Sequence, residues 1–180
     1  AAQCTGMGLT LLPTLYMRSG FSASGLRDDQ RRFASTPESI VRIVESVERQ
    51  TANDPLINVG VALHSLRAVT PAALKELASY TQGAGLPVHI HIAEQTQEVD
   101  DCRVHTGQRP VEWLLNHAAV DARWNLVHAT HTTPAELAGI QKTGASIVIR
   151  PSTEANLGDG VFDLPGYAAV QGTWSIGSDS

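Results

Sequence analysis

The sequence lacks the features that mark disulfide-rich secreted proteins and membrane-spanning proteins. Its 180 residues include only two cysteines, Cys4 and Cys102, which form neither a C-x-x-C pair nor a disulfide framework. No apolar run reaches the roughly 18 residues that a membrane-spanning helix needs. We therefore expect a reduced, cytoplasmic protein that does not cross a membrane.

Patterns of positive charge and of phosphate binding are also missing. The 13 Lys and Arg residues against 18 Asp and Glu residues give a formal net charge of −5, and no basic run occurs. We therefore expect no nucleic-acid partner. No G-x-G-x-x-G follows a strand-like run, and no G-x-x-x-x-G-K-[ST] occurs, so a nucleotide cradle lacks support. A G-x-S-x-G elbow is absent too, and neither cysteine lies in a strand-end cluster with histidine, which disfavours nucleophilic catalysis.

The chain does contain a regular alternation of strand-like and helix-like segments. Three predicted helices begin with the same pair, Thr36-Pro37, Thr70-Pro71 and Thr133-Pro134, in which threonine caps and proline fits the first turn. A further helix is predicted from Pro110, and Gly83 and Gly85 are predicted to end the second one. Apolar strand-length runs occupy 8–16, 57–63, 87–92, 124–128, 146–149 and 172–177. This alternation predicts a parallel α/β sheet with right-handed crossovers.

Polar side chains gather where the predicted strands end, at His64, His91, Glu94, His128 and Asp179. An α/β barrel places its chemistry at the carboxyl ends of its strands. We therefore predict an incomplete (β/α)8 TIM-like barrel over residues 1–180, since a complete one needs about 250 residues. An open α/β sheet is the alternative architecture.

His89 and His91 stand two positions apart in a predicted strand, so both imidazoles point to one face. Imidazole is the commonest nitrogen ligand of zinc, although two packed core histidines would give the same pattern. Glu94 follows just past the strand end, where a carboxylate could accept a proton from a metal-bound water. A carboxylate favoured by the dipole of a following helix is the alternative for Glu94.

His128 and His131 end the fourth predicted strand, and Asp179 ends the sixth. Because a helix begins directly after His131, a solvent-facing role is favoured for that residue. A carboxylate such as Asp179 is a hard oxygen ligand for zinc or iron, and a helix N-cap is its alternative.

Arg67 follows the second predicted strand and offers a planar fork of donors that suits a carboxylate, with a surface salt bridge as the alternative. Residues 154–160 form a polar, glycine-punctuated segment that either lines the mouth of the barrel or simply turns. Arg18 is predicted to be a solvated loop arginine.

Six phrases together resemble the amidohydrolase superfamily, in its deaminase branch. They follow the order of that family over nearly the whole chain, and the words around the His-x-x-Glu, His and Asp skeleton are more specific than the skeleton itself. The phrases are His64–Val69, His89–Gln95, Gly107–Glu112, Leu126–His131, Thr153–Gly160 and Gly177–Ser180.

This resemblance implies a role for each matching residue. His91 would be a metal ligand, and Glu94 would be the proton shuttle. His128 would contact the metal-bound water or the reacting group. Asp179 would be a second ligand, which also accepts a proton from the water.

The same resemblance implies that one divalent metal ion, zinc by preference, serves a small-molecule substrate. The implied reaction converts N-formimidoyl-L-glutamate to N-formyl-L-glutamate and ammonia, a step of histidine degradation, with His64 and Arg67 binding the glutamate portion. A homodimer is the expectation for the full-length protein. Another purine or amidine substrate such as guanine, and a metal-free fragment without catalysis, stay open as alternatives.

The chain departs from the family pattern in several places. The family's first-strand H-x-H is absent, because at least two strands precede His89 and His91. We expect a piece of a longer protein without the first two strands, the last helix and the small β domain, and expect weak or no activity from it alone. Arg150 stands where a smaller or apolar residue is typical, and His89, Arg18 and Glu154 receive no role.

Overall fold

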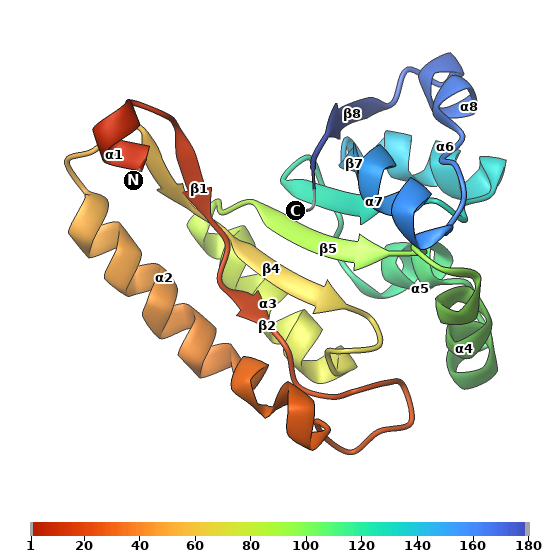
Figure 1. The fold of residues 1–180 in the computed structure, drawn as a ribbon, viewed down its shortest axis with the longest axis horizontal. Helices are drawn as coiled ribbons and strands as arrows, with labels where there is room; N and C mark the ends of the chain where they lie inside the picture. The colour runs from red at the N-terminus through yellow and green to blue at the C-terminus, as the bar shows by residue number, and fades with distance from the viewer. Residues whose placement is uncertain (1, 179–180) are drawn as a thin grey trace.

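A computed structural model describes residues 2–178 of the chain. Its centre is a six-stranded sheet in the order β2-β4-β5-β6-β7-β8, with every neighbouring pair parallel (Figure 1). A second parallel pair, β1 with β3, precedes β2 and β4 on the same two segments of chain, so each segment is one interrupted strand. The strands are β1 (Leu9–Leu11), β2 (Thr14–Leu15), β3 (Ile57–Val59), β4 (Val61–Ser65), β5 (Val88–Ile92), β6 (Trp124–His128), β7 (Ser146–Ile149) and β8 (Thr173–Ile176).

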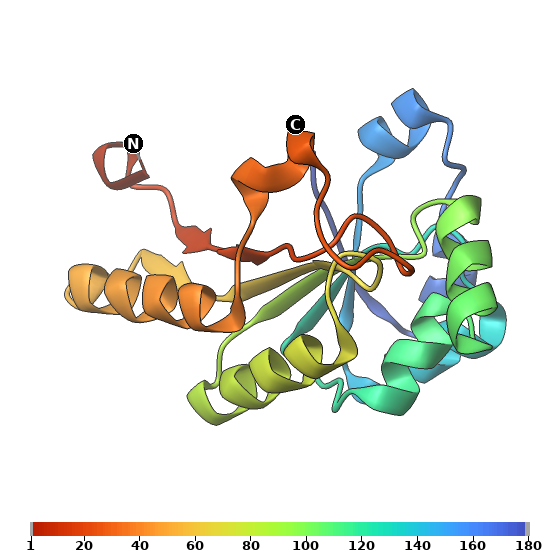
Figure 2. The same cartoon turned by 90° about the horizontal axis from the view of Figure 1, so that it is seen from below.

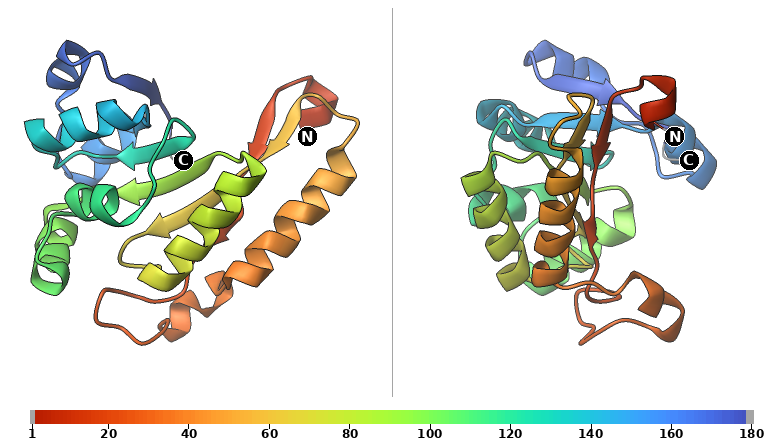
Figure 3. Two further views of the ribbon diagram at one scale, coloured as in Figure 1. Left: turned by 180° about the vertical axis from the view of Figure 1, so that it is seen from behind. Right: turned by 90° about the vertical axis from the view of Figure 1, so that its left-hand side faces the viewer.

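Helices connect the parallel strands, and α2 to α6 lie along the outer side of the curved sheet, with α2 beside α3 (Figures 2 and 3). Within the described residues, no helix combines the length and the apolar character needed to cross a membrane. The helices are α1 (Ala2–Thr5), the 3-10 helix η1 (Asp28–Phe33), α2 (Pro37–Thr51), α3 (Pro71–Ala84), α4 (Thr96–Thr106), α5 (Pro110–His117), α6 (Pro134–Thr143), α7 (Pro151–Leu157) and α8 (Leu164–Ala169).

The predicted helix starts are confirmed at the level of hydrogen bonds. The hydroxyls of Thr36, Thr70 and Thr133 each accept the backbone N–H three residues further on. Gly85 ends α3 with a φ of 69°, which glycine adopts at little cost. The prediction for Gly83 is wrong, because this residue still belongs to the helix.

The segment 154–160 was predicted to be irregular, and this is wrong for its first half. Helix α7 begins at Pro151 and includes Glu154, and Gly158 ends it in the left-handed conformation. The start and stop signals were present in the sequence. A helix of seven residues is too short to show the apolar periodicity that would have revealed it.

The sheet buries one face under the helices and turns the other toward the interior of the barrel. On β5, Val88, Ile90 and Ile92 are buried, whereas His89 and His91 alternate with them and are half-buried. Strands β2 and β8 are the two ends of the sheet within residues 2–178, and all residues of β8 are exposed. The sheet is therefore an open arc, which confirms the predicted incomplete barrel.

Candidate active site

Three histidines from neighbouring strands form a row at the carboxyl end of the sheet. The ring centroids of His64 on β4 and His91 on β5 are 5.2 Å apart, and those of His91 and His128 on β6 are 5.5 Å apart. The parallel register places the strand ends together, since Ile92 pairs with His128. The structure thus brings together three of the strand-end residues that the sequence analysis singled out.

One ring nitrogen of His91 is already occupied. Its Nδ1 lies 2.8 Å from the backbone carbonyl oxygen of His64, to which it donates. Burial lowers the pKa of His91, and this hydrogen bond opposes the shift. A neutral imidazole that donates through Nδ1 keeps the Nε2 lone pair, which is the form that binds a metal ion.

Glu94 lies between a guanidinium and an imidazole. Its Oε2 is 3.5 Å from Nη2 of Arg67, and its Oε1 is 3.6 Å from Nε2 of His128. The Glu94 side chain is only 12% exposed, so these charges interact in a partly desolvated site. A carboxylate in this position can take a proton from one group and deliver it to another.

A second carboxylate holds the turn that carries Glu94. Ala93 has a φ of 50°, in the left-handed region that is costly for a residue other than glycine. The two oxygens of Glu98 accept the backbone N–H groups of Ala93 at 3.2 Å and of Glu94 at 3.1 Å. Burial raises the pKa of Glu98 to about 7, and the charge of Arg67 opposes the shift. The sequence analysis missed Glu98, whose place in the first turn of α4 was the available signal.

His128 is almost fully buried and has a φ of 69°. Its Nδ1 lies 3.3 Å from Oε1 of Glu154, which is buried as well. The same oxygen accepts the backbone N–H of Arg150 at 2.9 Å. Helix α7 therefore reaches the row of histidines through Glu154, a residue to which the sequence analysis gave no role.

His64 lies near the end of β4, and Arg67 lies in the loop that follows this strand. The ring of His64 meets the ring of Tyr16 edge-on, with centroids 4.4 Å apart. Burial lowers the pKa of His64 to about 4, with His91 and Arg67 adding to the shift. His64 is therefore neutral at pH 7, beside a guanidinium that carries its full charge.

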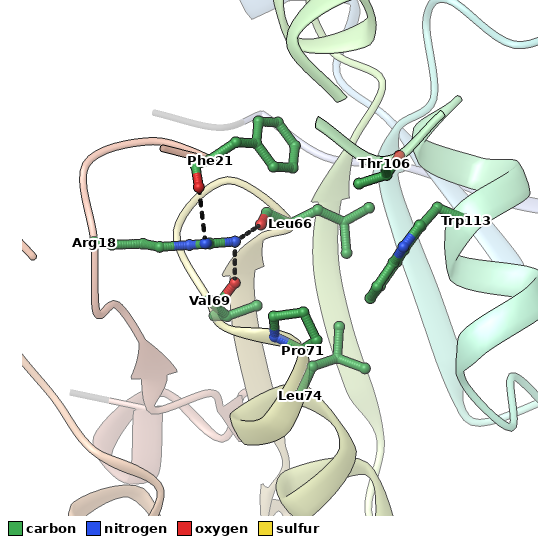
Figure 4. Close-up of a pocket in the computed structure, with 8 residues that line it drawn as sticks. All are labelled: Arg18, Phe21, Leu66, Val69, Pro71, Leu74, Thr106 and Trp113. Carbon is green, nitrogen blue, oxygen red and sulfur yellow. Dashed lines mark hydrogen bonds between the residues drawn. The ribbon is translucent and has the colours of Figure 1, made fainter. Parts of the chain in front are cut away.

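The prediction that Arg18 is a solvated loop residue is wrong. Its guanidinium donates to the backbone carbonyls of Phe21, Leu66 and Val69 at 2.8 to 3.1 Å (Figure 4). Beside it lies a cavity of about 30 Å³, which Trp113 closes from the side of α5. Because Leu66 and Val69 lie on either side of Arg67 in sequence, Arg18 holds the loop after β4 in place.

Comparison with known proteins places this geometry in a family. The profile of the amidohydrolase family matches residues 2–180. The chain belongs to the amidohydrolase family. A formimidoylglutamate deiminase of Pseudomonas aeruginosa is 46% identical over the whole chain, and the chain spans 39% of that protein's length.

Solved structures agree with the fold of this amidohydrolase. A crystal structure of an amidohydrolase from Brucella melitensis has a TM-score of 0.93 and 47% identity, covering 99% of this chain and 39% of that one. An adenosine deaminase from Xanthomonas campestris with bound zinc has a TM-score of 0.85 and 24% identity, covering 99% of this chain and 38% of that one. The chain spans less than half the length of each of these proteins.

The described residues of this amidohydrolase chain do not form a metal site by themselves. Within 2–178, no group of three His, Cys, Asp or Glu side chains is arranged to hold a metal ion. His91 fits a ligand role. Its Nδ1 donates a hydrogen bond to the backbone, so the lone pair of its Nε2 is the one that could bind a metal ion. Asp179, the other predicted ligand, lies outside the described residues.

The remaining singled-out residues lie apart from the pair formed by Glu94 and His128. His131 binds through its backbone, donating to the carbonyl of Ala93 and accepting from the guanidinium of Arg109. His89 and Arg150 line a cavity on the concave face together with His91. Burial lowers the pKa of His89, and Arg150 adds to the shift.

Proposed function

We propose that, in the complete protein, this site hydrolyses the formimino C–N bond of N-formimidoyl-L-glutamate. The observation that carries the proposal is the position of the Glu94 carboxylate, between Arg67 and Nε2 of His128 and three residues after His91. The 46% identity to a Pseudomonas protein named formimidoylglutamate deiminase supports this substrate.

We further propose that His91 and Asp179 hold one divalent metal ion, together with ligands from the rest of the protein. The free Nε2 of His91 supports this, and the zinc in the related Xanthomonas structure favours zinc. When bound, such an ion would lower the pKa of a coordinated water molecule toward neutrality.

Glu94 acts as the proton carrier in the proposed reaction. Water adds its oxygen to the formimino carbon, and Glu94 accepts the proton that the water loses. Glu94 then delivers this proton to the imino nitrogen, which becomes an amino group. The second proton of the water leaves the hydroxyl as the C–N bond breaks and reaches the same nitrogen, with Asp179 as its proposed carrier. In this way HN=CH–NH–R and H2O become O=CH–NH–R and NH3. The partly desolvated position of Glu94 between a guanidinium and an imidazole supports this role.

His64 and Arg67 bind the glutamate portion of the substrate. The guanidinium of Arg67 is 35% exposed and offers a fork of donors that matches a carboxylate. Neutral His64 adds a hydrogen-bonding group without a charge. Arg67 already contacts Glu94, so the residue that binds the substrate is a direct neighbour of the residue that carries the proton.

The setting of the enzyme follows from the same proposal. Two free cysteines, Cys4 and Cys102, support a cytoplasmic setting. The proposed reaction makes the protein an enzyme of histidine degradation with a small-molecule substrate. A homodimer, and the absence of a nucleic-acid partner, stay predictions.

The test is ammonia release by the complete, zinc-loaded protein from a panel of substrates. N-formimidoyl-L-glutamate is expected to give equimolar ammonia and N-formyl-L-glutamate. Guanine and adenosine are expected to give none. Deamination of a purine without turnover of N-formimidoyl-L-glutamate would show a different aminohydrolase.

A further inference from the structure

Glu154 is a buried carboxylate with two nitrogen neighbours on one of its oxygens. Its Oε1 lies 2.9 Å from the backbone nitrogen of Arg150 and 3.3 Å from Nδ1 of His128. The residue is only 4% exposed. A carboxylate is costly to bury without donors, so both contacts help to retain it.

A helix cap alone would account for only one of these contacts. Arg150 is the N-cap of α7, and a carboxylate in the first turn that accepts its N–H stabilises the start of the helix. The contact with His128 goes further, because it joins α7 to the end of β6. It also ends on an imidazole whose other nitrogen faces Glu94 at 3.6 Å.

The chemistry of imidazole gives this second contact a consequence. An ionised carboxylate only accepts hydrogen bonds, so Nδ1 of His128 must carry the proton in the pair with Glu154. A neutral imidazole protonated at Nδ1 has its lone pair on Nε2. That lone pair then lies on the side of Glu94, where it accepts a hydrogen bond once Glu94 carries the proton taken from water.

We propose that Glu154 is a positioning residue, which holds His128 with its proton on Nδ1 and its Nε2 lone pair directed toward Glu94. This inference rests on the proposed function, in which Glu94 carries the proton. His128 has a φ of 69°, which is costly for a residue other than glycine, so contacts such as the one with Glu154 help to retain this conformation. No proton leaves the imidazole in this role, and Glu154 does not touch the substrate.

The test is a double-mutant cycle on ammonia release by the complete protein. Glu154→Gln replaces the carboxylate with an amide, which can turn its NH2 group toward Nδ1. We expect kcat to fall about 10- to 100-fold, with KM changed less than about twofold. In a His128→Asn background the same change should alter kcat less than about twofold, because its target is gone. An equal loss in both backgrounds, or an unchanged kcat in the single variant, would overturn the proposal.

Glu136→Gln is the matched control. Glu136 is also a buried carboxylate at the start of a helix, where it accepts the N–H of Thr133 and binds Arg109. Its contacts are made at the start of α6 and with Arg109. Its substitution is expected to act to the same extent in both backgrounds.

A spectroscopic measurement separates this proposal from the proposed function. The 15N shifts of the His128 ring report its tautomer even if the wild type releases no ammonia from N-formimidoyl-L-glutamate. We expect Nδ1 to be protonated in the wild type and in Glu154→Asp, which retains the charge. We expect the proton to move toward Nε2 in Glu154→Gln. Protonation at Nε2 alone in the wild type would contradict the proposal, and Glu154→Asp replaces Glu154→Gln in the kinetic cycle if the latter does not fold.

Discussion

The side chains in this site differ in how many of their polar atoms already have a partner within the protein. His91 has one nitrogen bound to a backbone carbonyl, and Glu94 has a neighbour on each oxygen. Arg67 is the most exposed of these three groups and is the one that can exchange its present partner for a ligand. The chemistry of the site therefore depends on contacts that the protein makes before any substrate arrives.

Replacing the proton carrier should affect turnover more than binding. We expect Glu94→Gln in the complete protein to lower kcat for ammonia release about 10²- to 10⁴-fold, because the amide cannot accept the proton. Zinc content, measured in the same sample, should stay unchanged. Turnover at the wild-type rate would remove Glu94 from the mechanism.

Replacing Arg67 should affect binding more than turnover. Arg67→Ala removes the proposed donors to a substrate carboxylate, so we expect KM to rise about 10- to 100-fold. Arg49→Ala is the matched control, since Arg49 is exposed on α2 and pairs with Glu45 of the same helix. A normal KM for Arg67→Ala would rule out the carboxylate contact.

The buried carboxyl of Glu98 should make stability depend on pH. Its pKa is about 7 in the folded state against an ordinary value of 4.5, so the folded state retains a proton that the unfolded state loses between these values. The free energy of unfolding therefore falls as pH rises through this window.

We expect wild-type protein to lose stability relative to Glu98→Gln between pH 5 and about pH 7, as measured by denaturant unfolding at each pH. Glu76→Gln, on the exposed side of α3, is the control and should leave the pH dependence unchanged. Parallel pH curves for wild type and Glu98→Gln would contradict the account.

Strands and helices depend on a few close approaches of the backbone. Gly60 lies between β3 and β4, where a Cβ would stand 2.6 Å from the carbonyl oxygen of Pro87. We expect Gly60→Ala to lower the free energy of unfolding by about 1–3 kcal/mol, because the neighbouring strand must move. At Gly83 in α3 a Cβ would meet open space, so we expect Gly83→Ala to raise the free energy of unfolding by about 0.5–1 kcal/mol. Equal midpoints of unfolding for the two variants would show that the contact at Gly60 is unimportant.

Elements with strong local signals could be predicted, and short or polar ones could not. All six strand runs and the three Thr-Pro helix starts follow from periodicity and capping, which act within a few residues. Helix α7 was not predicted, because its seven residues are too few to show a periodic pattern of apolar side chains. The roles of Arg18 and Glu154 escaped for another reason, since their partners lie 48 and 26 positions away and only the folded chain brings them together.

The whole molecule is an open, curved sheet, and the candidate site lies at the carboxyl ends of its strands. The row of His64, His91 and His128 was predictable because parallel strands end at one edge, but the relation of Arg67 to Glu94 was not. Within residues 2–178 the arc holds no three-residue metal group. The complete protein must therefore supply further ligands if the proposed metal ion is bound.

Metal dependence of the complete protein tests this account most directly. After dialysis against a chelator, we expect ammonia release from N-formimidoyl-L-glutamate to stop, and we expect zinc to restore it. A zinc-treated Glu94→Gln sample should bind the metal but stay slow, which separates metal binding from proton transfer. Full turnover of N-formimidoyl-L-glutamate by protein shown to contain no metal would contradict the account.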